Sequence, residues 1–418
     1  MRVGSFLSGL PVPSGVSFPA LLLAAMTLAL PATAGSAVAA DPYQLARVID
    51  EPLEAAQRAA DIVPADNADD AEFLRRVTLD LAGRIPTVDE VTTFLNEPSP
   101  EKRSAVIDRL LDSDDHLEHF AKTWRALLLP ETETNAQLRY MVPGFERWLR
   151  EFRDANLPFD QFVEGLINVP ITGTPERPQL VLTDLKAANP MAYLVAKDAD
   201  PAKIAADVTR VFLGIRLECA QCHDHPFDTW TQEQFWNQAA FFAGIQRKGR
   251  GAFAPLFESA DVHTISLMGK DREVAALFLD GHEPAFSPGE KPRVTFSAWV
   301  AKPENPYFSR AIVNRIWGQL MGTGLIDPVD DMSIANPASH PELLDALAAG
   351  WTTSQFDLDN LYRAICNSRA YQRTSRMTDP SQLEVRSYAK MAVKSLSGEQ
   401  IYDSLELAVG WTQQQQQR

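Results

Sequence analysis

The stretch that decides the fold is residues 200–244, "DPAKIAADVTRVFLGIRLECAQCHDHPFDTWTQEQFWNQAAFFAG". Asp200 is a typical N-cap residue, Pro201 suits the first helical position, and Gly214 suits the end of the same helix. Between them, apolar residues recur at helical spacing (Ile204, Val208, Val211 and Phe212). The pattern predicts a helix over 201–213 with one buried face.

A second helix follows the cysteines. Thr231 and Gln234 have the spacing of a capping box, and Gly244 suits the helix end. Its apolar face is unusually aromatic (Phe235, Trp236, Phe242). The segment 215–230 is therefore expected to lie between two helices that can each supply an apolar wall, with Phe212 as the first helix's contribution.

Helix signals also dominate the rest of the chain. Start signals stand at several positions (Thr87 with Glu90, Ser99 with Pro100, Asn305 with Pro306, Ser339 with Glu342, and Asp357). Residues 246–293 differ, because short β-type runs alternate there with turn residues. The predicted fold is mainly α: two helical domains joined by a segment of loops and short strands.

The chain is too long for one core, which favours more than one domain. We expect five regions: a signal peptide (1–40), a helical domain holding the cysteine pair (41–245), a linker with short strands (246–293), a second helical domain (294–410) and a polar Gln-rich tail (411–418).

The first forty residues resemble an export signal. Arg2 is the only charge before Asp41, and the apolar run "PALLLAAMTLAL" (19–30) precedes small residues that suit signal peptidase. The run is short for a membrane span, although an uncleaved segment that tethers the chain is the alternative. We therefore expect a periplasmic or extracellular protein with no membrane span beyond the signal segment. The formal net charge of −16 disfavours nucleic-acid binding.

Cys219, Cys222 and His223 form the motif C-x-x-C-H, which is typical of covalent haem c attachment. Two thiols at this spacing can add to the two vinyl groups of a haem, and the adjacent imidazole can bind the iron as proximal ligand. Met268, 45 residues beyond His223 (268 − 223), is a candidate distal ligand. Other candidates are Met321, His263 and His282.

Three other interpretations stay open. Cys219, Cys222, His223 and His225 could hold zinc or non-haem iron directly. The cysteine pair could instead be a redox disulfide, although no helix amino terminus is expected at Cys219 to lower the thiol pKa. The segment could also be a purely structural turn.

Asp224, His225 and Asp228 are the candidate catalytic residues. A carboxylate that orients His225 would make it a proton donor, whereas the structural alternative has these side chains bonding to the loop backbone. His116 and His119 are expected on a solvated helix face. Other residues favour structural roles (Cys366 as a buried thiol; Arg310 and Arg315 solvated or salt-bridged).

Four segments resemble a known family: "RRVTLDLAGRIPTVDEVTTFL" (75–95), "TRVFLGIRLECAQCHDHPFDTWTQEQFW" (209–236), "NPYFSRAIVNRIWGQLMGTGLIDPVDD" (305–331), and "SHPELLDALA" (339–348) with "LYRAICNSRAYQRTS" (361–375). They are similar to a pair of domains of unknown function found together in large secreted planctomycete proteins, the first labelled cytochrome C-like. The resemblance implies an exported protein, and its frequent association with sulfatase-like proteins hints at polysaccharide use.

The sequence therefore predicts an exported c-type cytochrome-like protein. Its role would be electron transfer, or a haem-dependent redox step, with a redox partner protein in the cell envelope. Two alternatives are a zinc- or iron-dependent enzyme acting on extracellular glycans and a non-catalytic envelope scaffold.

Overall fold

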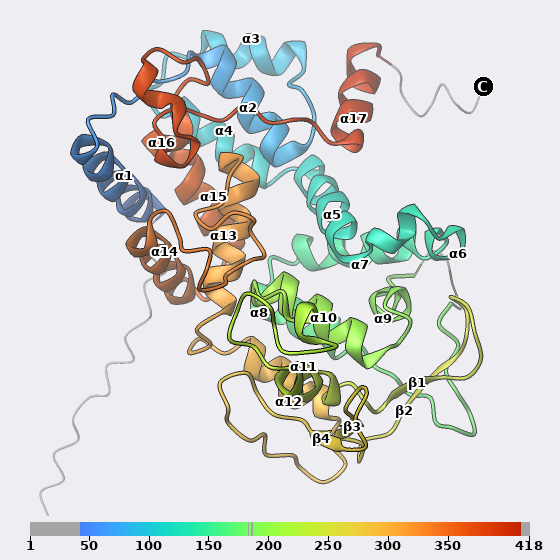
Figure 1. The fold of residues 1–418 in the computed structure, drawn as a ribbon. Helices are drawn as coiled ribbons and strands as arrows, with labels where there is room; N and C mark the ends of the chain where they lie inside the picture. The colour runs from blue at the N-terminus through green and yellow to red at the C-terminus, as the bar shows by residue number, and fades with distance from the viewer. Residues whose placement is uncertain (1–41, 183, 185–186, 411–418) are drawn as a thin grey trace, which may run out of the picture. The chain divides into compact units, whose positions relative to one another are not determined.

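A computed structural model describes residues 42–182, 184 and 187–410. The predicted signal peptide and Gln-rich tail lie outside these residues. The described chain is mainly helical, which confirms the predicted fold class (Figure 1). Helices from both halves of the sequence share one hydrophobic core.

The α-helices are α1 (Pro42–Ala59), α2 (Asp70–Ala82), α3 (Val88–Asn96), α4 (Lys102–Leu111), α5 (Asp114–Leu128), α6 (Ala136–Arg139), α7 (Val142–Asp154), α8 (Phe159–Ile167), α9 (Ala192–Ala196), α10 (Pro201–Phe212), α11 (Gln232–Ala240), α12 (Pro292–Val300), α13 (Phe308–Met321), α14 (Pro341–Thr353), α15 (Leu358–Asn367), α16 (Arg369–Gln372) and α17 (Gly398–Ala408). Short 3-10 helices are η1 (Pro130–Glu133), η2 (Leu217–Ala220), η3 (Pro380–Leu383) and η4 (Val385–Ser387).

Several helix starts follow from the predicted caps. Thr87 and Glu90 form a reciprocal capping box at α3, and Thr231 and Gln234 form another at α11. Each box satisfies two backbone N–H groups that would otherwise lack a partner at the helix start. The Asp357 side chain likewise caps α15.

Two predicted caps are wrong. α4 begins at Lys102, because Ser99 and Pro100 form a turn before it in which the Ser99 hydroxyl accepts from the Glu101 amide. At α14 the Ser339 hydroxyl donates to the Leu325 carbonyl, so it caps no helix. A tertiary hydrogen bond has taken the group that the local pattern assigned to the cap.

The core joins residues far apart in sequence. α1 packs against both α14 and α15, and Figure 1 shows it next to each of them. Near them, aromatic side chains from four helices pack against one another (Trp124, Phe159, Phe162, Phe308 and Trp351). Aromatic burial of this kind contributes strongly to stability and fixes how the helices cross.

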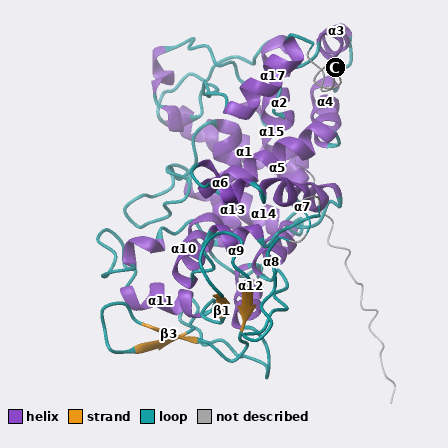
Figure 2. Ribbon diagram, turned by 90° about the vertical axis from the view of Figure 1, so that its right-hand side faces the viewer, coloured by secondary structure: helices purple, strands orange, loops and turns teal. Residues whose placement is uncertain are grey.

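The strands are short and form two hairpins, as expected for 246–293. β1 (Ile245–Arg247) pairs antiparallel with β2 (Leu256–Glu258), and β3 (Thr264–Ser266) with β4 (Glu273–Ala275). β3 and β4 pack beside α11; Figure 2 shows the strands in orange. The β3–β4 hairpin thereby reaches the cysteine segment. Within residues 42–182, 184 and 187–410, no helix has the length and apolar character needed to cross a bilayer.

Candidate functional site

The C-x-x-C-H segment is fixed at its entry by the end of α10. Asp200 caps that helix through the amides of Ala202 and Lys203, and Gly214 follows its last turn with φ +70°. The Gly214 carbonyl accepts from the Met332 amide at 2.8 Å. A Cβ at Gly214 would lie 2.9 Å from the Met332 sulfur, so glycine meets both the backbone angle and the close approach.

The motif itself begins in η2. Leu217 and Ala220 are fully buried, whereas Cys219 and Cys222 are exposed free thiols. The 3-10 turn therefore anchors its apolar residues in the core, and Cys219 within it and Cys222 just beyond it face solvent. Its exit is held by the Trp236 indole, which donates to the Gln221 carbonyl at 3.0 Å.

His223 is exposed, and its ring has a defined orientation. Nδ1 lies 2.7 Å from the Asp224 carbonyl oxygen. A carbonyl can only accept, so Nδ1 donates in this bond, and Nε2 makes no hydrogen bond with described residues. Histidines that bind metals are commonly oriented in this way, with the second ring nitrogen donating to a backbone carbonyl. His223 thus presents a nitrogen donor beside two free thiols.

Met268 lies beside the motif in the turn between β3 and β4. The buried Gln232 side-chain amide is 3.0 Å from the Cys222 carbonyl and 3.2 Å from the Met268 carbonyl. The Met268 side chain is half exposed. One glutamine therefore joins the motif to the turn that holds the candidate distal ligand.

The other candidate distal ligands lie elsewhere. Met321 is buried in the core, His263 packs against the Phe286 ring, and His282 pairs with Asp280 at 3.1 Å.

The three candidate catalytic residues contact the loop backbone. The Asp224 carboxylate accepts from the Gln232 amide at 2.8 Å, and Asp228 accepts from Thr229 at 2.7 Å. His225 Nδ1 accepts from the Phe227 amide at 3.2 Å. These bonds match the structural alternative, in which the side chains shape the loop.

The electrostatic surroundings of Cys219 disfavour a reactive thiolate. Partial burial raises the pKa of the Cys219 thiol above its ordinary value, and the Glu218 carboxylate raises it further. Burial also raises the pKa of Glu218. Redox-active cysteine pairs need a lowered thiol pKa, so the redox-disulfide interpretation gains no support.

Two charged residues from the second half of the chain, Asp330 and Arg315, reach this region. Arg216 and Arg210 both pair with Asp330, at 2.7 Å and 3.3 Å. Arg315, whose pKa burial lowers to about 10, donates to the carbonyls of Arg210 and Val211 at the end of α10. The Asp330 pairs fix the loop 327–336 against the entry to the motif, and Arg315 joins α13 to the end of α10.

The donor set can be compared with what a bare metal ion and a haem would each require. Among the residues that the structure describes, no three His, Cys, Asp or Glu side chains are grouped so that they could hold a metal ion. A zinc site of Cys219, Cys222, His223 and His225 is therefore not assembled. The thiol pair with an adjacent free imidazole nitrogen has the donors that haem c requires.

The expected apolar walls are only partly present. Phe212, Phe235 and Phe242 are completely buried in the core, so they are not open walls for a ligand. The apolar side chains that are exposed at or beside the motif are instead Phe227 and Met268, at 80% and 51%. Any porphyrin here would lie against the outer surface of the loop.

His116 departs from the expected solvated face. It is buried on α5, where its Nδ1 lies 2.7 Å from the Leu81 carbonyl and its Nε2 3.3 Å from Arg153 Nε. Arg153 in turn pairs with Asp359. Burial, and then the Arg153 charge, lower the pKa of His116 to about 3, so this imidazole is neutral at pH 7. Cys366 is buried, as expected.

Comparison with known families defines the class of protein. Residues 48–247, which include the motif, match a model described as PSCyt2, a protein of unknown function (DUF1549). Residues 292–417 match PSD1, a protein of unknown function (DUF1553). The chain therefore belongs to the planctomycete cytochrome-like family in which these two domains are paired. Neither a curated protein nor a solved structure matches it.

Proposed function

We propose that this protein is an exported c-type cytochrome-like protein that carries haem on Cys219 and Cys222. One observation carries the proposal: His223 Nδ1 is bound to the Asp224 carbonyl, which leaves Nε2 free beside two exposed thiols. Haem c, when bound, supplies a one-electron carrier. The family name and the predicted export signal point in the same direction.

Each residue of the motif has a separate task. The Cys219 and Cys222 thiols would hold the haem as thioethers, each sulfur taking one vinyl carbon and each thiol hydrogen the other, with no net oxidation. The Asp224 carbonyl holds the His223 ring so that Nε2 can serve as proximal ligand. Gln232 keeps the Met268 turn beside the motif, and Met268 is the proposed distal ligand.

The position of the motif supports electron transfer to another protein. Cys219, Cys222 and His223 are all exposed, so a cofactor held by them would have an edge at the protein surface. A redox partner protein in the cell envelope could approach that edge without a conformational change. We place the protein in the periplasm or outside the cell on the basis of its predicted signal segment.

The test is haem staining and intact mass of protein exported by a host that matures c-type cytochromes. Covalent haem survives denaturing electrophoresis, so the wild-type band should stain and its mass should exceed that of the polypeptide by one haem. Cys219→Ala with Cys222→Ala should remove both signals.

Cys366→Ala is the matched control, because it removes the one cysteine outside the motif and should leave the stain unchanged. His223→Ala should weaken iron binding on the proximal side and alter the visible spectrum. A mature wild-type protein with the mass of its polypeptide alone would overturn the proposal.

A further inference from the structure

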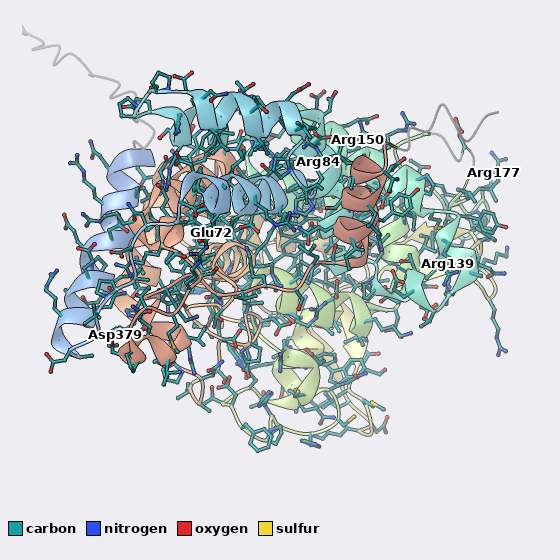
Figure 3. The ribbon with its side chains drawn as sticks, turned by 90° about the horizontal axis from the view of Figure 1, so that it is seen from above. Glu72, Arg84, Arg139, Arg150, Arg177 and Asp379 are labelled. Carbon is teal, nitrogen blue, oxygen red and sulfur yellow. The ribbon has the colours of Figure 1, made fainter. Side chains whose placement is uncertain are left out.

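A second site lies away from the motif, between α2, α5 and residues 392–397. It is a cleft of about 540 Å³, within the size range of small-molecule sites. Figure 3 labels Glu72 where α2 runs beside the segment leading to α17. None of residues 219–230 lines this α2–α17 cleft, so it is separate from the proposed haem site.

Most charges in the cleft are already paired. Arg76 is bound to Glu72 at 2.7 Å, and Lys394 is bound to Asp80 at 2.5 Å. Burial lowers the pKa of His119 below its ordinary value. These two ion pairs leave none of their four charged groups unpaired for a ligand.

Arg75 is the exception. Its exposed side chain lines the cleft, and it has no ion pair or hydrogen bond with any residue that the structure describes. The cleft therefore carries one uncompensated positive charge in a chain whose formal net charge is −16. A guanidinium is well suited to bind a carboxylate through two parallel hydrogen bonds.

The remaining lining suits a mostly apolar body. Its apolar side chains come from both halves of the chain (Leu79, Ala392, Val393 and Leu396). Three polar side chains, Thr123, Gln319 and Ser395, make no hydrogen bond with described residues and so could meet a few polar atoms. No Phe, Tyr or Trp side chain is among the described residues that line the cleft, so none is there to stack on a sugar ring.

We infer that the α2–α17 cleft binds a small organic carboxylate with an apolar body, whose carboxylate pairs with Arg75. The ligand would touch α2 and α5 from the first family region and residues 392–397 from the second. The site does not depend on haem, and its test uses the full mature chain with or without the cofactor.

The probes are hexanoate, hexanol and hexylamine, which share one apolar body and differ in charge. Titration calorimetry and ligand-observed NMR should show that hexanoate binds about tenfold to a hundredfold more tightly than hexanol, as expected for a charge-assisted pair. Hexylamine should bind more weakly than both.

The variants test whether Arg75 supplies the positive charge and whether the ligand binds inside the cleft. Arg75→Gln should lower the affinity for hexanoate about tenfold and leave hexanol binding unchanged, whereas Arg75→Lys should keep most of the affinity. Ser395→Trp should obstruct the cleft and weaken both ligands. Arg109→Gln is the matched control, because Arg109 is an exposed arginine on α4 outside the cleft.

Several results would overturn the inference. These are equal binding of hexanoate and hexanol, preference for hexylamine, no hexanoate binding to the wild type, or equal affinity of the Arg75→Gln and Arg109→Gln variants. Loss of haem in the staining experiment would leave this inference untouched, so the two proposals fail separately.

Discussion

Gln232 is the residue whose replacement tests the geometry of the motif most directly. Its side-chain nitrogen lies 3.3, 3.0 and 3.2 Å from the carbonyl oxygens of Gln221, Cys222 and Met268. An amide nitrogen carries two hydrogens, so at most two of these three bonds are well formed at once. Gln232→Leu keeps the approximate size and removes both donors.

The expected cost follows from those two bonds. Each contributes about 0.5–1.5 kcal/mol net, and water can reach part of this loop, so Gln232→Leu should destabilise the fold by about 1–2 kcal/mol. Gln232→Glu should cost roughly 3 kcal/mol, because a charged acceptor would face carbonyl oxygens that also only accept.

The assay has a global and a local part. Urea unfolding should report the loss in stability, and amide hydrogen exchange should increase in both 217–224 and 266–272, since Gln232 joins these segments. Gln246→Leu is the control, because Gln246 is exposed on β1 and forms no side-chain hydrogen bond with described residues. Faster exchange in the motif with an unchanged Met268 turn would refute the idea that Gln232 holds the two together.

Three further predictions concern the helices around the site. Gly214→Ala should destabilise the protein by about 1–2 kcal/mol from the left-handed backbone alone, and by more through contact with Met332, which thermal unfolding would detect. Asp200→Ala should cost about 1 kcal/mol in urea unfolding through loss of the α10 cap, whereas Asp200→Asn should cost less. Burial alone would raise the pKa of Glu90, but hydrogen bonds from Arg84 and the Thr87 amide outweigh it and hold the pKa at about 2. The folded-state pKa is thus below the ordinary 4.5. The ionised Glu90 therefore stabilises the fold above about pH 4.5, and this stabilisation is lost as the pH falls toward 2. The difference in unfolding free energy between wild type and Glu90→Gln should shrink over that range.

Local patterns predicted the helices well where the capping partners are neighbours in sequence. The boxes at Thr87 and Thr231 need only residues three positions apart, and both are present. The box predicted at Ser339 failed because its hydroxyl bonds to the Leu325 carbonyl. No rule based on sequence spacing predicts that contact, since it depends on how two segments pack.

The same limit applies to the sites. The sequence indicated the motif and proposed Met268, but the role of Gln232 depends on a turn that returns from 36 residues away. The burial of His116 needs Arg153 and, through it, Asp359. The α2–α17 cleft was missed entirely, because Arg75 and Ser395 are brought together only by the tertiary fold.

The packing of α1 has a consequence for biosynthesis. Its buried residues Leu45, Ile49 and Leu53 lie on a helix that packs against α14 and α15. The contact with α14 is close: a Cβ added at Gly350 would lie 2.5 Å from Leu45 Cδ1. Those partners are translated roughly three hundred codons later. A chain that terminates early would therefore leave the buried face of α1 without α14 and α15 to cover it, which makes it a target for chaperones and quality-control proteases.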